Sequence, residues 1–307
     1  GRGVLRRAQR RTRVAGRGFF LEMSTRRVRR SVLFVPAVRP DRFAKAVATG
    51  ADAVCIDLED GVSVEQKDQA RDNALALLAE RPACRAEVML RINEPGSDLG
   101  ERDLAALVGA GFSPDSLMVP KVSGPETLTS LERRLGPGLA GLPLIVQIET
   151  ARGLAAAETI ATASPNVAVL FFGAVDLSAE LGCAIEWDAL LYARSRVVAA
   201  AALVGVDAMD TPFMDVSDPD QLDEEAAAVR RLGFTGKAAI HPTQVPVIQG
   251  AFSPDAAAVA WARRMVEAYE ANLGGVLLID GKLIERPVIA SAQRILAIAD
   301  AVHAATN

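Results

Sequence analysis

Short apolar runs that end in polar residues recur along the chain, separated by longer segments with helical spacing. Between them, Ala- and Leu-rich segments such as 68–80 and 189–205 repeat apolar residues every three or four positions. This alternation of strand and helix is typical of parallel βα units. The runs are 32–37, 53–60, 87–93, 116–122, 143–150, 168–176, 207–213 and 236–242. Eight such units predict an α/β fold, a (β/α)8 TIM barrel.

In such a barrel the carboxyl ends of the strands, and the loops after them, form the active face. The run 53–60, AVCIDLED, fits this arrangement because a buried strand would emerge at Asp57, Glu59 and Asp60. By the same logic one cavity should be surrounded by Arg91, Asn93, Lys121, Gln147, Glu149, Asp176, Asp210 and His241. A doubly wound open sheet is the alternative, but no Gly-rich phosphate fingerprint follows an early strand. We therefore predict the barrel.

The pattern changes after residue 250. Segments 253–272 and 287–303 both have the spacing of amphipathic helices. The stretch between them, LGGVLLIDGKLIERP, is typical of a short hairpin or flap with Asp-Gly at its turn. We predict a TIM barrel over residues 30–250 and a C-terminal extension of helices and flap over residues 251–307.

Charge is distributed unevenly along the chain. Residues 1–30 contain eleven Arg and a single acid, Glu22, for a net charge of +10, so the rest of the chain carries −14 of the total of −4. A transit peptide is an alternative interpretation, but this segment lacks the usual serine content. We expect residues 1–29 to be a basic N-terminal extension, disordered or left over from upstream or expression sequence, with Met23 as the natural start.

The acidic body limits the function classes. It has no basic stripe for nucleic acid and no apolar stretch long enough to cross a bilayer. Its three cysteines are odd in number and widely spaced, which predicts neither a disulfide framework nor a zinc site. A reducing, cytoplasmic setting is the expectation.

Glu149 and Asp176 form the sharpest candidate pair, because each ends a predicted strand and the two strands are neighbours in the barrel. Two adjacent carboxylates in a cleft repel each other unless they share a proton or a cation, and oxygen ligands of this kind suit Mg²⁺. Helix capping is an equally good explanation of both acids from the spacing alone.

The acids of the run DLED and the nearby arginine allow two interpretations. Asp57, Glu59 and Asp60 could hold metal-bound waters or orient basic residues, whereas capping and loop ion pairs are the structural alternative, favoured for Asp60. Arg91 lies among apolar neighbours, where an unpaired guanidinium would be costly, so it should face a carboxylate or a substrate anion. A structural ion pair with Glu59 or Asp60 is compatible with that role.

Two further features carry weaker signals. RPDRFAKA, residues 39–46, places Arg39, Arg42 and Lys45 after the first strand, where they could bind phosphates or form a solvated helix face. His241 could serve as a general base, but a hydrogen-bonded histidine at a strand end is as good an explanation. We assign it no chemistry.

Several motifs in register resemble the citrate lyase β-subunit-like branch of the HpcH/HpaI aldolase and citrate lyase superfamily. They include DLEDGVSVEQKDQAR, LRIN, VPKV, IETARGL, FFGAVDLSAELG and GFTGKAAIHPTQ, and the resemblance extends from about residue 30 to residue 296. It implies a (β/α)8 barrel, dependence on Mg²⁺ with Mn²⁺ as a substitute, and CoA thioester substrates. The implied reaction is reversible cleavage of a 3-hydroxyacyl-CoA, of malyl-CoA or citramalyl-CoA type, to an acyl-CoA and a 2-oxo acid.

The resemblance also implies roles for individual residues. Glu149 and Asp176 would be the metal ligands, and Arg91 would hold the substrate oxygen and stabilise the enolate. Glu59 and Asp60 would order the metal waters and Arg91. CoA phosphates would be contacted by Arg30, Arg39 and Lys45.

The flap is where the sequence departs from the family pattern. Members of this kind donate a flap Asp from a neighbouring subunit of a homotrimer, or of a hexamer, whereas the matching residue here is Glu285; Asp280 aligns less well. A catalytic group displaced by about 1 Å can lose on the order of 100-fold in rate. Three alternatives therefore stay open: a thioesterase, a CoA-independent 2-oxo acid aldolase, and the β subunit of a citrate lyase complex.

Overall fold

The computed structural model describes residues 27–81, 83–272, 277–279 and 281–306. Most of the predicted basic extension, and Asp280 of the flap, lie outside these residues. The described chain divides into two compact units; the first covers residues 29–252, and the second holds the described residues from 253 onward together with residues 27 and 28. Each unit is described by itself.

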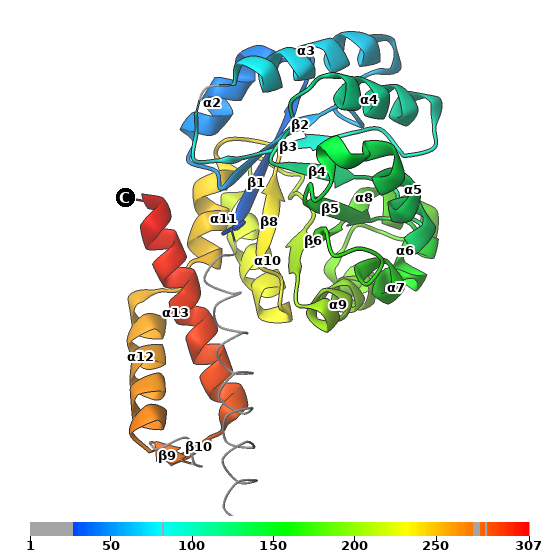
Figure 1. The fold of residues 1–307 in the computed structure, drawn as a ribbon. Coiled ribbons are helices and arrows are strands. Elements are labelled where there is room, and N and C mark those ends of the chain that lie inside the picture. Colours follow the sequence, from blue (N-terminus) through cyan, green and yellow to red (C-terminus); the bar gives the residue numbers. More distant parts are fainter. Residues whose placement is uncertain (1–26, 82, 273–276, 280, 307) are drawn as a thin grey trace, which may run out of the picture. The chain divides into compact units, whose positions relative to one another are not determined.

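The first unit is a closed barrel of eight parallel strands, which confirms the predicted fold (Figure 1). Each strand pairs with the next along the chain, and β1 closes the barrel against β8. The strands are β1 (Ser31–Pro36), β2 (Ala53–Asp57), β3 (Glu87–Arg91), β4 (Ser116–Val119), β5 (Leu144–Ile148), β6 (Val167–Phe172), β7 (Asp207–Asp210) and β8 (Gly236–Ala239).

Helices follow the strands and surround the barrel (Figure 1). The α-helices are α2 (Phe43–Ala48), α3 (Lys67–Glu80), α4 (Asp98–Gly109), α5 (Pro125–Leu135), α6 (Ala151–Ala155), α7 (Ala157–Ala161), α8 (Ala174–Leu181), α9 (Trp187–Val204), α10 (Pro219–Leu232) and α11 (Gln244–Phe252). Short 3₁₀ turns are η1 (Pro40–Arg42), η2 (Val64–Gln66) and η3 (Pro137–Leu139). Capping side chains begin several helices; Ser97, for example, accepts the backbone N–H of Gly100 at the start of α4.

The period of two along the strands separates two cores. Inside the barrel lie alternate strand residues such as Cys55, Met89, Ile145 and Phe171, whereas their neighbours along each strand pack against the helices. Two residues after Cys55, Met89 and Ile145, and so also facing inward, come Asp57, Arg91 and Gln147. Glu149 lies two residues after Gln147, just past the end of β5. The hydrophobic alternation thus directs these polar groups toward the barrel axis.

The second unit pairs two helices with a hairpin. Helices α12 (Ala256–Ala271) and α13 (Arg286–Thr306) flank the antiparallel strands β9 (Leu277–Ile279) and β10 (Lys282–Ile284). Gly281, in the turn between the strands, has a positive φ of 73°, which glycine adopts without strain. A small core joins the helices and the hairpin and contains Ala262, Met265, Ile284, Ile289 and Ala292.

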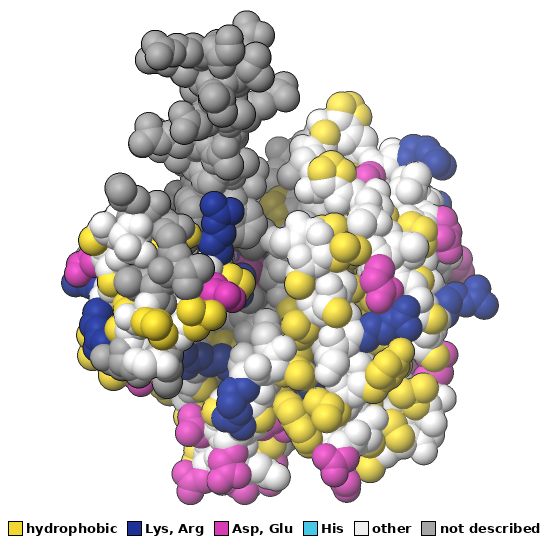
Figure 2. Space-filling view, turned by 90° about the horizontal axis from the view of Figure 1, so that it is seen from below, with side chains coloured by type: hydrophobic (Ala, Val, Ile, Leu, Met, Phe, Trp, Pro, Cys, Tyr) yellow, Lys and Arg dark blue, Asp and Glu magenta, His cyan; other side chains and the backbone are white. Residues whose placement is uncertain are grey.

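The surface carries charges of both signs. On the face shown in Figure 2, basic and acidic side chains are interspersed among scattered hydrophobic ones. This face shows no single-sign stripe of the kind that binds nucleic acid. No helix in the described part of the chain is long and apolar enough to span a membrane.

Candidate functional site

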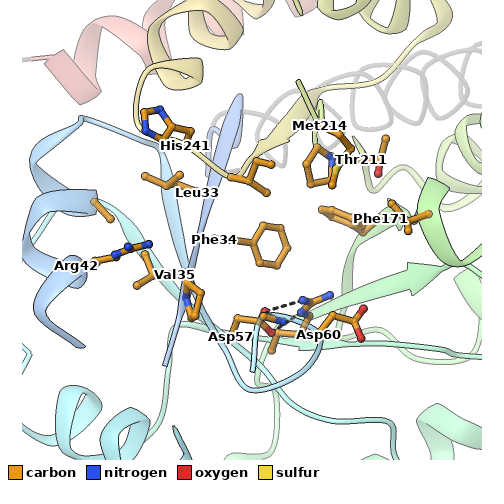
Figure 3. Close-up of a pocket in the computed structure, with 18 of the residues that line it drawn as sticks. Leu33, Phe34, Val35, Arg42, Asp57, Asp60, Phe171, Thr211, Met214 and His241 are labelled. Atoms are coloured by element: carbon orange, nitrogen blue, oxygen red, sulfur yellow. Dashed lines mark hydrogen bonds and ion pairs between the residues drawn. The ribbon is translucent and has the colours of Figure 1, made fainter. Parts of the chain in front are cut away.

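A pocket of about 730 Å³ opens where the carboxyl ends of the barrel strands meet. Its lining comes from strands β1, β2, β3, β5 and β6 and from segments that follow strands, including those after β7 and β8, so residues far apart in sequence share one cavity. Phe34 and Phe171 form its apolar floor in edge-to-face contact, with Asp57 and Asp60 on one side and Arg42 and His241 on another (Figure 3). We call the side with the acids the acidic wall and the side with Arg39, Arg42 and Lys45 the basic wall.

Glu149 is deeply buried in the acidic wall, with 2 % of its surface exposed. One carboxylate oxygen accepts the backbone N–H of Lys121 at 2.7 Å and the other accepts the Gln147 amide at 2.9 Å. Gly173 lies so close that a Cβ there would approach the Glu149 carboxylate to 2.5 Å. Burial, followed by the charge of Glu59, raises the pKa of Glu149 to about 8, and Asp176 adds to the rise.

Asp176 lines the same pocket but does not end a strand as predicted. Strand β6 stops at Phe172, and Asp176 lies in the first turn of α8. The error has a simple cause: the apolar run continues past Gly173, so the sequence pattern hides the change from strand to helix. Its carboxylate lies 3.8 Å from the Lys121 ammonium.

Arg91 is held rigidly by the acids around it. Its Nε and Nη2 donate to the two oxygens of Asp57, both at 2.7 Å, and its Nη1 lies 2.8 Å from Glu59. The guanidinium also stacks 4.9 Å from the centre of the Phe34 ring. Burial opposes the charge, but Asp57 and then Glu59 raise the pKa of Arg91 overall, so the group stays cationic.

Glu59 and Asp60 have different surroundings. Glu59 is buried beside Arg91, and Lys121 lies 3.1 Å from its other oxygen, yet neither carboxylate oxygen has a well-aligned hydrogen bond in the described chain. Burial raises the pKa of Glu59, Arg91 and Lys121 oppose this, and Asp60 adds to it. Asp60 is more than half exposed and faces the pocket.

Lys67 supports this wall, although the sequence analysis predicts no role for it. The buried Lys67 ammonium donates at 2.7 Å to the carbonyls of Leu58 and Glu59 and to the Asn93 side chain. Burial lowers the pKa of Lys67. Lys67 therefore holds the loop after β2 in place through its backbone carbonyls. A lysine at the start of a helix, on the buried side, is the only sequence signal of such a role.

Two residues expected around the cavity point elsewhere. Asp210 has the opposite phase to the inward Met209, so it faces the helices, where it binds Arg194 and Lys237 at 3.0 and 2.7 Å. Asn93 binds Lys67 and also Asp103, behind the pocket. His241 does line the pocket, and its ring contacts Thr243 at 2.8 Å.

The basic wall contains Arg39 and Lys45 as predicted, together with Arg42. Arg39 is already engaged, because its guanidinium donates at 2.8 Å to both oxygens of the exposed Asp41. The short helix α2 and the turn η1 before it carry these cations outside the core.

Arg30, predicted to contact CoA phosphates, is not brought to the pocket. It precedes β1 at the amino end of the barrel, where its guanidinium donates to Asp52 at 2.9 and 2.7 Å. The pocket opens at the other end of the strands, so the structure gives no support to that role.

Glu285 belongs to the second unit and stands immediately before α13. It is exposed, and its carbonyl accepts backbone N–H groups of that helix, from Val288 and Ile289. Its side-chain role therefore stays a prediction.

Glu149 and Asp176 are the residues that could hold a metal ion. Within the described ranges no group of three or more His, Cys, Asp or Glu is arranged to do so. Two carboxylates with the remaining positions left to water or substrate are nevertheless a donor set that fits Mg²⁺, which retains several waters. Burial raises the pKa of the Glu149 carboxyl to about 8, and a bound cation would stabilise the charged form of this buried group.

Known proteins resemble this chain over most of its length. The sequence model of the HpcH/HpaI aldolase/citrate lyase family matches residues 30–242. The citrate lyase subunit beta-like protein of Mycobacterium tuberculosis is 36% identical, over 86% of this chain and 93% of its own length. The mitochondrial citramalyl-CoA lyase of Rattus norvegicus is 32% identical, over 89% and 87%.

A solved structure agrees with both sequence comparisons. It is the protein CitE from Mycobacterium tuberculosis in complex with magnesium, acetoacetate and coenzyme A, with a TM-score of 0.74 and 35% identity, covering 88% of this chain and 98% of the other. Family, fold and relatives thus coincide over the barrel that carries the pocket. The chain belongs to the HpcH/HpaI aldolase/citrate lyase family.

Proposed function

We propose that the protein is a CoA-dependent carbon–carbon lyase that requires Mg²⁺. In this proposal it cleaves a 3-hydroxyacyl-CoA of malyl-CoA or citramalyl-CoA type, reversibly, to an acyl-CoA and a 2-oxo acid. The observation that carries it is that an acid pair, a fixed guanidinium and a basic wall line one pocket. The names of the relatives, citramalyl-CoA lyase and citrate lyase subunit beta-like protein, support the same class.

Glu149 and Asp176 would hold the metal. When bound, Mg²⁺ acts as a Lewis acid that lowers the pKa of a coordinated hydroxyl and neutralises carboxylate charge; Mn²⁺ prefers similar oxygen ligands. Lys121 and Gln147 fix both oxygens of Glu149 before any ligand arrives. Glu59, whose two oxygens face Arg91 and Lys121, and Asp60 would accept further hydrogen bonds from waters at this wall.

Arg91 would stabilise the negative charge of the leaving thioester enolate. Its guanidinium is already oriented by Asp57 and Glu59, so little reorganisation is needed when charge develops. The apolar floor of Phe34 and Phe171 limits water near the reacting bond, which strengthens such electrostatic stabilisation.

The basic wall would bind the CoA phosphates. Arg42 and Lys45 line the pocket and carry the charge for this contact, and Arg39 would first have to release Asp41. A pocket with this wall favours a CoA ester over a small free acid. It is therefore an argument against the CoA-independent aldolase.

Glu285 would supply the acid that protonates the enolate, from a neighbouring copy in a homotrimer or hexamer. This part rests on the motif KLIERP and on the hairpin β9–β10 that precedes it. A carboxylic acid is competent as a proton donor. A thioesterase is the second candidate, because Glu285 is one methylene longer than the family's Asp and would shift the donor.

The test is product analysis by mass spectrometry. Purified protein is incubated with malyl-CoA and citramalyl-CoA, each with Mg²⁺ and with EDTA, beside Glu149→Gln as the inactive control. Acetyl-CoA with glyoxylate or pyruvate, formed only with Mg²⁺, is the expected result. Free CoA with the hydroxy acid would instead indicate a thioesterase.

No turnover of either ester would contradict the lyase and would favour a subunit that works on a carrier partner in a citrate lyase complex. The mass of the native protein with its co-purifying partners separates that case. The same measurement reports whether the protein forms a trimer or a hexamer.

A further inference from the structure

Lys121 stands out by its backbone conformation. Its φ of 53° is the only positive φ among the described residues other than glycine. Such strain costs on the order of 1–3 kcal/mol and persists where the surroundings determine it, often at functional sites. Here the backbone N–H of Lys121 donates to Glu149 at 2.7 Å, and its carbonyl accepts the Ser123 hydroxyl at 3.2 Å. The unusual backbone thus serves the buried acid directly.

The side chain of Lys121 lies beside three further acids of the same wall. Its ammonium lies 3.1 Å from Glu59, 3.8 Å from Asp176 and 4.0 Å from Asp60. Burial opposes its charge, but Glu59 and then Asp60 and Asp176 raise the pKa of Lys121. One residue therefore contacts both proposed metal ligands and both acids beside them.

The contacts of this ammonium differ in strength. Glu59 is buried and close, so that pair is firm, whereas the Asp176 and Asp60 side chains are 35% and 56% exposed and lie farther away. Long ion pairs in contact with water contribute little, about 0–1 kcal/mol. Lys121 can therefore give up Asp176 to another cation while it keeps Glu59.

We propose that Lys121 holds the cation position of the metal-free acidic wall and so couples metal binding to the 2-oxo acid. This inference rests on the proposed function. A divalent ion bound to Glu149 and Asp176 would meet the repulsion of the ammonium, which is stronger here than in water. The carboxylate of a 2-oxo acid adds negative charge and offsets that repulsion. Lys121 is a positioning residue that sets metal affinity and makes it depend on substrate.

The experiment measures Mn²⁺ binding rather than turnover. The full chain is titrated with Mn²⁺ alone, and again with saturating pyruvate or glyoxylate, while free Mn²⁺ is followed by electron paramagnetic resonance. The variants are Lys121→Met and Lys121→Gln, which remove the charge, and Lys121→Arg, which keeps it. Arg102→Met is the matched control, because Arg102 is exposed and its ion pair, at 3.8 Å, is with Asp68 outside the pocket.

We expect the two uncharged variants, without 2-oxo acid, to bind Mn²⁺ about tenfold more tightly than the unchanged protein, or more. Pyruvate or glyoxylate should then tighten their Mn²⁺ binding much less than it does in the unchanged protein. Lys121→Arg and Arg102→Met should keep the original affinity and the original coupling.

Equal or weaker Mn²⁺ binding by both uncharged variants, with the coupling unchanged and cooperative thermal unfolding retained, would overturn the proposal. A different failure is recognisable: if the unchanged protein binds no Mn²⁺ even with the 2-oxo acid, the proposed lyase function fails first. The two outcomes are thus separated by the behaviour of the unchanged protein.

Discussion

The two charged walls of the pocket are built in opposite ways. In the acidic wall, Glu149 and Arg91 come from the strand ends, and each is held by two or more polar contacts. In the basic wall, Arg39 and Lys45 lie on or beside a short exposed helix, and the ion pair of Arg39 is with its near neighbour Asp41. Buried charges without partners are costly, whereas surface pairs contribute about 0–1 kcal/mol. We infer that the acidic wall holds its reacting groups in place before a ligand binds, whereas the side chains of the basic wall can move to fit the ligand.

The largest effect should come from Glu149→Gln. If Glu149 holds the metal as proposed, its loss removes several kcal/mol of charge stabilisation, so kcat/KM should fall about 1,000-fold or more. Lyase assays with varied Mg²⁺ check this, with Glu158→Gln as a control, because Glu158 pairs with Arg196 away from the pocket. Near-normal activity of Glu149→Gln would show that the acidic wall does not take part in the reaction.

Arg91→Lys should be the next most severe change. Lysine keeps the charge but cannot bond both oxygens of Asp57 at once, so the preorganised geometry is lost. We expect kcat to fall on the order of 100-fold, with folding retained because the buried acids keep a cation. Steady-state kinetics and urea unfolding separate the two effects. A kcat close to that of the unchanged protein would show that Arg91 is only structural.

Glu149 should also shape stability against pH in metal-free protein. Its folded pKa of about 8 lies above the ordinary value of 4.5, so the folded state binds this proton more tightly than the unfolded state. Its contribution is fully present below about pH 4.5 and is lost as the pH rises through 8, a loss of a few kcal/mol at about 1.4 kcal/mol per pKa unit.

Urea unfolding from pH 5 to pH 8.5, in EDTA, measures this slope. Glu149→Gln should reduce it, and Mg²⁺ should reduce it in the unchanged protein by favouring the ionised carboxylate. An identical slope in the variant would mean that other groups dominate.

Arg42→Ala and Lys45→Ala test the basic wall. Each should raise KM for the CoA ester about fivefold, equivalent to about 1 kcal/mol, with a smaller change in kcat. The effect should shrink at high salt, because exposed charges are screened. Initial rates at low and high NaCl provide the measurement. A fall in kcat as large as that of Arg91→Lys would show that the basic wall contributes to the reaction step as much as the acidic wall does, and not only to binding.

Arg39→Ala should have the smallest effect, below about twofold in KM, because Arg39 is already paired with Asp41. Asp41→Ala is the companion variant and should lower KM slightly by releasing the guanidinium. The same initial-rate assay compares the two. A large loss of affinity in Arg39→Ala would show that CoA displaces Asp41.

Much of this arrangement could be predicted from the strand pattern. The period of two fixes which residues face the barrel axis, so Arg91 and Glu149 were identifiable by phase and by position at a strand end. The prediction for Asp210 is wrong because a position at the end of a strand does not decide which face of the sheet a side chain occupies. Met209 faces the barrel interior, so Asp210 faces the helices. Asp176 was placed on a strand because apolar residues continue across Gly173 into the helix.

Other features depend on contacts that no local pattern reveals. The pairing of Arg30 with Asp52 joins two segments at the amino end of the barrel, although the resemblance to the family implies a CoA contact for Arg30. The positive φ of Lys121 follows from the loop that delivers its N–H to Glu149, and lysine as a residue type gives no sign of it. For Glu285 the sequence predicts a role, and the arrangement of copies would decide it.

The closeness of Gly173 to Glu149 has a consequence for how this site can change over time. Any side chain at residue 173 would overlap the side chain of Glu149, which follows β5. Glu149 can therefore keep its position only while residue 173 is glycine. The two positions are thus not free to vary one at a time. A shorter acid at 149 would not relieve this, because a Cβ at residue 173 would also lie 2.5 Å from the Cβ of residue 149 itself. Glycine at residue 173 is therefore a condition for a side chain at residue 149, whatever its length, and this limits the routes by which the barrel could acquire a different site.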